Sequence, residues 1–392
     1  MPASPSRFDI LGIGNAIVDV VAPAGDDFLS RHDMRKGGMA LISAEQAEAL
    51  YAAMPPGQES SGGSAANTCA VAAGLGARVA FLGKVADDQL GGVFRHDITA
   101  AGVHFPTAPL TGQAPTARCL IAVTPDGQRT MNTYLGACVS FGGADLDEAA
   151  VADSAVTYLE GYLFDPPQAQ AAFRRAAEVA HAAGRLVALS LSDAFCVDRH
   201  RAAFRILVRD SVDILFANET ELCSLYEENE WEAAAAHAAK DVALAVLTRG
   251  ADGSVVLRGT ERVDVAAAPA RVVDTTGAGD AYAAGFLAAY RAKYDRDPIA
   301  PQAMSAYVGM RVLLDCIAAA GATDYERVLA AAARMDKPFG TYETGYGLKF
   351  DKTMQNIRAL PLIAQWQGGR VVAVYPAEAA APGMRLAGLA RQ

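Results

Sequence analysis

The chain has 392 residues, of which 52% are hydrophobic and 20% are charged, and its formal net charge is −10. This composition is typical of a globular protein with a large core, and the length leaves room for a second unit. The acidic balance argues against general binding to nucleic acid or to an anionic membrane, because both require a basic surface.

The remaining bulk features favour a cytoplasmic protein. No apolar run approaches the roughly 20 residues of a membrane span, and residues 1–7 lack the apolar core of a secretory signal. The six cysteines are scattered without CxxC pairs, which fits reduced thiols better than disulfides or a zinc site.

The first predicted element is a buried strand at residues 8–14 that ends in a glycine turn. Its glycines begin like a dinucleotide-binding fingerprint, but position 17 is Ile, so the GxGxxG spacing fails. A Walker A loop is also absent, since Gly83-Lys84 is followed by Val85.

Apolar runs then alternate with alanine-rich helical stretches. Strands are expected at residues 79–83, 156–159, 186–189, 214–216 and 244–247, and helices at residues 167–183, 199–209 and 231–240. This alternation predicts an α/β layer with a parallel sheet and right-handed crossovers. Residues 115–140 depart from it and predict a β-hairpin around Asp126-Gly127, of the kind that often forms a lid.

Polar clusters follow several of the strands, at the sheet edge where α/β proteins bind ligands. Asn15 and Asp19 could together hold a vicinal diol. Gly62 and Gly63 would let a ligand approach the backbone, with Asn67 one turn into the next helix. Each of these clusters, taken alone, fits an ordinary turn or helix cap as well or better.

Two further clusters suit a nucleotide. Asn218 and Glu221 could manage a hydrated Mg²⁺ ion near phosphates, because Mg²⁺ keeps several waters and takes few protein ligands. Taken alone, an N-cap role for Asn218 is the stronger interpretation. Residues 247–253 form a strand end and a glycine-rich turn that would suit phosphates but equally fit a hairpin turn.

The most informative segment is residues 272–287, an apolar entry, a glycine-rich turn, an acid and a helical run. Backbone N–H groups at a helix N-terminus favour phosphate, and Gly277 and Gly279 allow the tight turn. Asp280 would repel a phosphate unless it takes a proton from an attacking hydroxyl. The segment therefore predicts phosphoryl transfer to an alcohol, although the motif alone also fits a plain strand-turn-helix.

In combination, these motifs resemble the ribokinase-like (PfkB) family of sugar and nucleoside kinases, and its adenosine kinase branch most closely. Residues 274–280 resemble the family's C-terminal signature, Gly62-Gly63 with Asn67 its N-terminal one, and residues 218–221 its NxxE motif. The resemblance covers residues 8 to about 286. It implies a kinase domain at residues 1–290 with a three-layer α/β/α core and a small β lid from parts of 15–50 and 113–140.

The resemblance also implies a reaction, in which the γ-phosphoryl group of ATP passes to the primary hydroxyl of a nucleoside, adenosine being favoured, or of a sugar. The catalytic residues would be the base Asp280 and the backbone donors Gly277, Ala278 and Gly279. The ATP and Mg²⁺ site would comprise Asn218, Thr248, Gly250, Gly253, Thr275, the lid residue Arg129 and, toward the metal, Glu221. The acceptor site would comprise Asn15, Asp19, Gly62, Gly63, Asn67 and Tyr162, for which a core tyrosine is the alternative.

After about residue 286 the chain departs from that family. Residues 291–392 resemble the C-terminal end of a periplasmic branched-chain amino-acid (type 1 solute-binding) protein, with Trp366-Gln367-Gly368-Gly369 as a turn between two strands. An atypical α+β segment, joined by gene fusion or rearrangement, is therefore expected. Its alanine-rich helix at 302–320 could partly replace the residues that close over the ATP adenine.

Two functions stay open at this point. One is an active kinase, a monomer or homodimer, with ATP and a small nucleoside or sugar as its partners. The other is a catalytically impaired nucleoside- or sugar-binding protein whose adenine site is disrupted by the C-terminal segment. A solute-binding module is disfavoured, because the N-terminal lobe of such a protein is missing.

Overall fold

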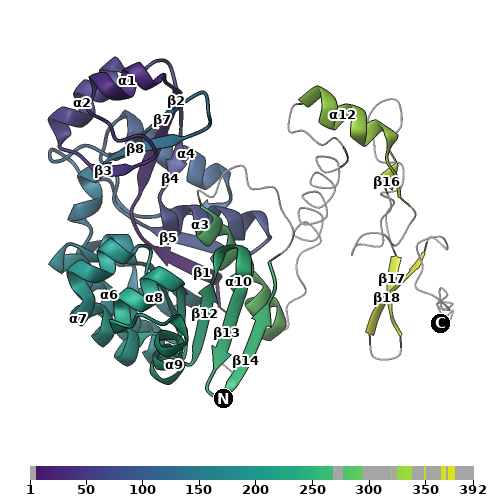
Figure 1. The fold of residues 1–392 in the computed structure, drawn as a ribbon. Helices are drawn as coiled ribbons and strands as arrows, with labels where there is room; N and C mark the ends of the chain where they lie inside the picture. Colours follow the sequence, from purple (N-terminus) through teal and green to yellow (C-terminus); the bar gives the residue numbers. More distant parts are fainter. Residues whose placement is uncertain are drawn as a thin grey trace. The chain divides into compact units, whose positions relative to one another are not determined.

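The computed structural model describes residues 6–267, 277–294, 319, 325–337, 348–349, 363–367 and 370–375 (Figure 1). The chain divides into two compact units, Met1–Asp297 and Pro298–Gln392. The first unit contains a large sheet, a small sheet and the helices that cover them.

The large sheet has nine strands in the order β14-β13-β12-β11-β10-β9-β1-β5-β6. Its strands are β1 (Phe8–Ile13), β5 (Val79–Leu82), β6 (Val103–His104), β9 (Ser154–Glu160), β10 (Leu186–Ser190), β11 (Ile214–Asn218), β12 (Leu244–Thr248), β13 (Ser254–Arg258) and β14 (Glu261–Val265). The strands from β6 to β12 are parallel, whereas β13 and β14 add an antiparallel edge. The six strands expected from the sequence are all present in this sheet.

Two apolar clusters cover the opposite faces of this sheet. Ile10 and Leu11 are neighbours on β1 but belong to different clusters, because successive side chains of a strand point to opposite faces. Burial on both faces explains why these strands are continuous apolar runs. The expected three-layer α/β/α core is therefore confirmed.

The helices divide between the two faces. One face is covered by α5 (Glu148–Ala152), α6 (Pro167–Ala182), α7 (Ala194–Ser211), α8 (Glu219–Tyr226) and α9 (Trp231–Asp241). The other is covered by α3 (Ser64–Gly74), α4 (Gln89–Ala100) and α10 (Ala278–Tyr294). Helix α7 begins five residues before its expected start at 199, because Asp193 caps it by accepting a hydrogen bond from the backbone N–H of Phe195. Short 3₁₀ helices are η1 (Gly136–Ser140), η2 (Gly143–Asp145), η3 (Gly161–Phe164) and η4 (Gly250–Asp252).

The small sheet has five strands in the order β3-β8-β7-β2-β4. They are β2 (Ile17–Pro23), β3 (Met39–Leu41), β4 (Gln58–Gly62), β7 (Ala117–Val123) and β8 (Arg129–Tyr134), with helices α1 (Asp26–Arg31) and α2 (Ala44–Ala53) beside them in the chain. Strands β7 and β8 form the expected hairpin, and Gly127 supplies the positive φ of its turn, +82°. The sheet also includes β4, which lies outside the two segments expected to form the lid.

The described parts of the second unit are α12 (Tyr325–Arg334), β15 (Asp336–Lys337), β16 (Leu348–Lys349), β17 (Ile363–Gln367) and β18 (Arg370–Tyr375). Strands β17 and β18 pair antiparallel, so the two strands expected around residues 366–369 are present. The helix expected at 302–320 lies outside the described residues except at position 319.

Two bulk expectations can be compared with the described residues. The cysteines described there, Cys69, Cys119, Cys138, Cys196 and Cys223, are free thiols. No helix in the described ranges is long and apolar enough to cross a membrane.

Candidate functional site

A cavity of about 690 Å³ opens at the carboxyl ends of the parallel strands. Four of its lining residues, Glu160, Ser190, Asn218 and Thr248, are the last residues of β9, β10, β11 and β12. The small sheet lines the cavity with residues of β2, β3, β7 and β8, and the N-terminal turns of α3 and α10 also border it. Parallel strands thus bring polar groups that are far apart in sequence to one edge of the sheet.

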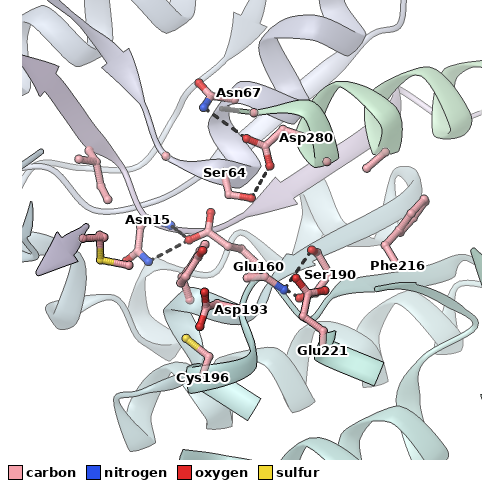
Figure 2. A pocket seen from close by; sticks show the side chains of 18 of the residues that line it. Asn15, Ser64, Asn67, Glu160, Ser190, Asp193, Cys196, Phe216, Glu221 and Asp280 are labelled. Atoms are coloured by element: carbon pink, nitrogen blue, oxygen red, sulfur yellow. Dashed lines mark hydrogen bonds between the residues drawn. The ribbon is translucent and has the colours of Figure 1, made fainter. Parts of the chain in front are cut away.

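Asp280 lies in the first turn of α10, directly after the Gly277-Ala278-Gly279 turn, and all four residues line the cavity. Its Oδ1 accepts a hydrogen bond from Ser64 Oγ at 2.6 Å, and its Oδ2 accepts one from Asn67 Nδ2 at 3.4 Å (Figure 2). Burial raises the pKa of Asp280, and these two hydrogen bonds oppose the rise. The arrangement is a half-buried carboxylate beside a helix N-terminus, which can accept a proton close to a bound anion.

Asn15 follows β1 and lines the same cavity. Its backbone N–H and its Nδ2 donate to Glu160 Oε1 at 3.1 and 2.9 Å, and the backbone N–H of Ala65 donates to Glu160 Oε2 at 2.7 Å. Figure 2 shows Glu160 between Asn15 and the Ser64–Asp280 pair. Burial raises the pKa of Glu160 to about 7, although its backbone hydrogen bonds lower it.

Asp19 reaches the cavity from β2 of the small sheet. Burial raises its pKa to about 6, the charge of Arg129 lowers it, and the charge of Asp280 raises it. Asp19 and Asp280 therefore interact across the cavity as two carboxylates of like charge. Arg129, expected in the ATP site, does not line the cavity. Its charge lowers the pKa of Asp19, which does line the cavity.

Asn218 and Glu221 form a capping box at the start of α8. Asn218 Oδ1 accepts from the backbone N–H of Glu221 at 2.9 Å, while the backbone N–H and Nδ2 of Asn218 donate to the Glu221 carboxylate at 3.0 and 2.6 Å. Burial raises the pKa of Glu221 to about 7, and its hydrogen bond from the backbone of Asn218 opposes the rise. No group of three or more His, Cys, Asp or Glu side chains suited to a metal ion occurs within the described ranges.

Most of the residues expected in the site line this cavity. They are Asn15, Asp19, Gly63, Asn67, Tyr162, Asn218, Glu221, Thr248, Gly277, Ala278, Gly279 and Asp280. Thr275 lies outside the described residues.

Three expected glycines do not line the cavity. Gly62 lies against the carboxylate of Asp19, which occupies the space where a Cβ would be. Gly250 begins the 3₁₀ turn η4. Gly253 packs against the backbone of Val265 and Ala267, where β12 turns back into β13.

Sequence reasoning missed two groups of lining residues. Glu160 and Ser64 are polar residues at a strand end and at a helix start, which is the signal that identified their neighbours. The second group is apolar: Met39, Leu41 and Phe195 line the cavity with 50%, 56% and 74% of their surface exposed. No sequence pattern marks such a group, because it comes from β3 and α7, which lie far apart in the chain.

The fold and the cavity together define a ribokinase-like α/β protein. Residues 41–302 match the model of the pfkB family carbohydrate kinases, and this chain belongs to that family. A solved structure of adenosine kinase from Sinorhizobium meliloti is 51% identical, with a TM-score of 0.69 over 79% of this chain and 94% of that one. An ATP-dependent ribose-1-phosphate kinase from Halopiger xanaduensis is 31% identical over 237 residues, 59% of this chain and 74% of that protein.

A second kind of relative matches a shorter stretch. The Leu/Ile/Val-binding protein homolog 8 of Brucella abortus is 37% identical over 100 residues, which are 26% of this chain. The match spans 25% of that relative's length. Its length of 100 residues is close to that of the C-terminal segment, 291–392, expected to resemble a solute-binding protein.

Proposed function

We propose that this kinase transfers the γ-phosphoryl group of ATP to the primary hydroxyl of a nucleoside, with adenosine the favoured acceptor. The observation that carries the proposal is the placement of Asp280, a half-buried carboxylate in the first turn of α10 that lines the cavity. Ser64 and Asn67 hold its two oxygens. A carboxylate held in this way can take the proton from the acceptor hydroxyl as that oxygen attacks the phosphoryl group.

The turn before Asp280 supplies the second part of the proposed site. The backbone N–H groups of Gly277, Ala278 and Gly279 lie at the positive end of α10 and border the cavity. Backbone donors fixed before the reaction stabilise the negative charge that spreads over the transferring phosphoryl group. The proposed base and the proposed anion site are thus adjacent on one helix.

The acceptor would lie between the two sheets. Asn15, Asp19, Gly63 and Asn67 provide amide, carboxylate and backbone groups for the ribose hydroxyls. Met39, Leu41 and Phe195 would cover an aromatic base, which would remove their apolar surface from water. That apolar wall favours a nucleoside over a free sugar, in line with the similarity to an adenosine kinase.

ATP and Mg²⁺ fit the donors at the other end of the cavity. Asn218, Glu221 and Thr248 lie there, at the ends of β11 and β12. One carboxylate and an amide suit a magnesium ion that keeps most of its waters. When bound, the ion would neutralise part of the phosphate charge, and Glu221 would orient its waters while remaining the partner of Asn218.

One observation favours a second candidate function. The match to a Leu/Ile/Val-binding protein is 100 residues long, close to the length of the C-terminal segment that departs from the kinase pattern. If that segment came from such a protein, the residues that would cover the adenine of ATP would be replaced. A nucleoside-binding protein with little kinase activity would result if the replacement abolished ATP binding.

Two measurements on the purified chain decide between these functions. The first is phosphoryl transfer from ATP with Mg²⁺ to adenosine, other nucleosides, ribose, fructose and ribose 1-phosphate, followed by mass spectrometry of the product. We expect adenosine to give the highest kcat/KM. The second is calorimetric titration with ATP. Submillimolar binding would reject the impaired-protein alternative, whereas adenosine binding without transfer to any acceptor would reject the kinase.

A further inference from the structure

Glu160 is the most enclosed ionisable group at the cavity, with 1% of its surface exposed. It ends β9, and its two oxygens accept three N–H groups, two from Asn15 and one from Ala65. One carboxylate thus joins the end of β9, the turn after β1 and the first turn of α3. Gly14 leaves it room, because a Cβ there would contact the carboxylate.

The contact with Glu160 decides which way the amide of Asn15 points. Above about pH 7 Glu160 is ionised and its carboxylate can only accept hydrogen bonds, so the group of Asn15 that faces it is the NH₂ group, Nδ2. The carbonyl oxygen Oδ1 then points away from Glu160. Asn15 is 2% exposed and lines the cavity, and within the described part of the chain no donor is found for this oxygen. A ligand bound in the cavity can supply this donor through a hydroxyl group.

We propose that Glu160 is a positioning residue for the acceptor: it fixes the amide of Asn15 so that Oδ1 accepts a hydrogen bond from a hydroxyl of the acceptor. The inference rests on the proposed function in one respect, namely that the acceptor is a hydroxylated sugar moiety bound at Asn15. Glu160 has no contact with the reacting atoms in this role. It acts on ground-state binding, so its loss changes acceptor affinity rather than the chemical step.

The test is a double-mutant cycle with Glu160→Gln and Asn15→Ala, measured by calorimetry with adenosine and by steady-state kinetics. In Glu160→Gln one oxygen becomes an NH₂ group that cannot accept, so the amide of Asn15 loses its fixed orientation. We expect the adenosine Kd and KM to rise up to ~10-fold, the range for a hydrogen bond between two neutral groups, here the amide oxygen and a hydroxyl. We expect kcat to stay within about threefold and the KM for ATP to stay unchanged.

The cycle separates positioning from a general structural effect. If Glu160 acts through Asn15, the double variant binds adenosine no more weakly than Asn15→Ala alone, which is strong non-additivity. Glu160→Asp keeps the negative charge but shortens the side chain by one methylene group. It is measured in the same cycle with Asn15→Ala, so that the test does not depend on the folding of a single variant. Glu148→Gln is the matched control, because Glu148 accepts two N–H groups from Arg175 at an exposed position outside the cavity.

Additive losses in the two variants, or a fall in kcat with unchanged adenosine affinity, would overturn the positioning role. Failure of the proposed function looks different. In that case the wild-type chain itself transfers no phosphoryl group, whatever the variants do.

Discussion

Ser64 and Asp280 are 216 residues apart in the chain, yet Ser64 Oγ donates a hydrogen bond of 2.6 Å to Asp280 Oδ1. The bond joins the first turn of α3 to the first turn of α10. It favours the ionised form of the carboxylate and therefore opposes the rise in pKa that burial causes. We expect this pair to set the pH at which the proposed base becomes active.

Replacing Ser64 by Ala should therefore raise the pKa of Asp280 further. A base must be deprotonated to act, so kcat falls as the pH drops through its pKa. In Ser64→Ala this fall should begin at a higher pH, while activity at alkaline pH is largely kept. The kcat–pH profiles of the two proteins measure the displacement, and superimposable profiles would show that the bond does not control the base.

Replacing Asp280 by Asn should remove the proposed base but keep its size. We expect kcat to fall at least ~100-fold, within the range of general-base effects, while calorimetry shows adenosine binding retained. Asp19→Asn is the matched comparison, because Asp19 is a second half-buried carboxylate in the same cavity. It should weaken adenosine binding more than it lowers kcat. Near-normal turnover in Asp280→Asn would reject the assignment of the base.

Asn218→Ala should reduce both stability and ATP affinity. The substitution removes the capping box of α8, and loss of an N-cap side chain costs about 1 kcal/mol of unfolding free energy. Ser43→Ala removes the same kind of capping box from α2, beside the small sheet. Both variants should lose similar stability in denaturant titrations, but only Asn218→Ala should raise the KM for ATP. If the KM for ATP is unchanged in both variants, Asn218 caps α8 but does not contribute to ATP binding.

A comparison of Gly63 with Gly127, both of which have positive φ, tests whether Gly63 is needed for adenosine binding or only for its backbone conformation. Gly127, at +82° in the hairpin turn, has open space where a Cβ would go, whereas a Cβ on Gly63, at +97°, would contact the carbonyl oxygen of Asn15. Gly127→Ala should cost about 1 kcal/mol of stability and leave adenosine binding intact. Gly63→Ala should cost more and also abolish adenosine binding. Equal effects on binding would contradict this distinction.

The buried carboxylates predict an unusual dependence of stability on pH. Burial raises the pKa of Asp19 to about 6 and those of Glu160 and Glu221 to about 7. The native state therefore holds protons that the unfolded chain releases from about pH 4 upward. Each such proton lowers the unfolding free energy by up to about 1.4 kcal/mol per pH unit until the native group also ionises.

Denaturant titrations between pH 5 and pH 7.5 should accordingly show stability falling as the pH rises. Glu221→Gln cannot ionise at this position, so its curve should fall less steeply than that of the wild-type chain. A curve that is flat or rises across this window would contradict the direction of these shifts.

Much of this architecture follows from local sequence patterns. Alternating apolar runs and alanine-rich stretches predict the parallel sheet, and Asp126-Gly127 predicts the hairpin, because each signal is contained in a few adjacent residues. Polar residues after the strands then predict most of the cavity wall, since the carboxyl ends of parallel strands share one edge.

The contacts that organise the site could not be predicted in this way. Glu160 accepts from Asn15, 145 residues away, and from Ala65, 95 residues away. The register between strands, which no local pattern encodes, brings these groups together. The same limit applies to Gly62 and Gly253, whose packing against Asp19 and Val265 is not encoded in the residues next to them in the chain.

The join between the two sheets has a mechanical consequence. Strand β1 of the large sheet ends at Ile13 and β2 of the small sheet begins at Ile17, while Gly63 alone separates β4 from α3. If the small sheet rotated on these two short connections, the axis would pass near Asn15 and Gly63. Atoms near an axis move least, so a hydroxyl held at Asn15 would keep its place, while Met39 on the edge strand β3 of the small sheet would move further. Such a rotation would change the width of the cavity opening while the acceptor hydroxyl stays bound at Asn15.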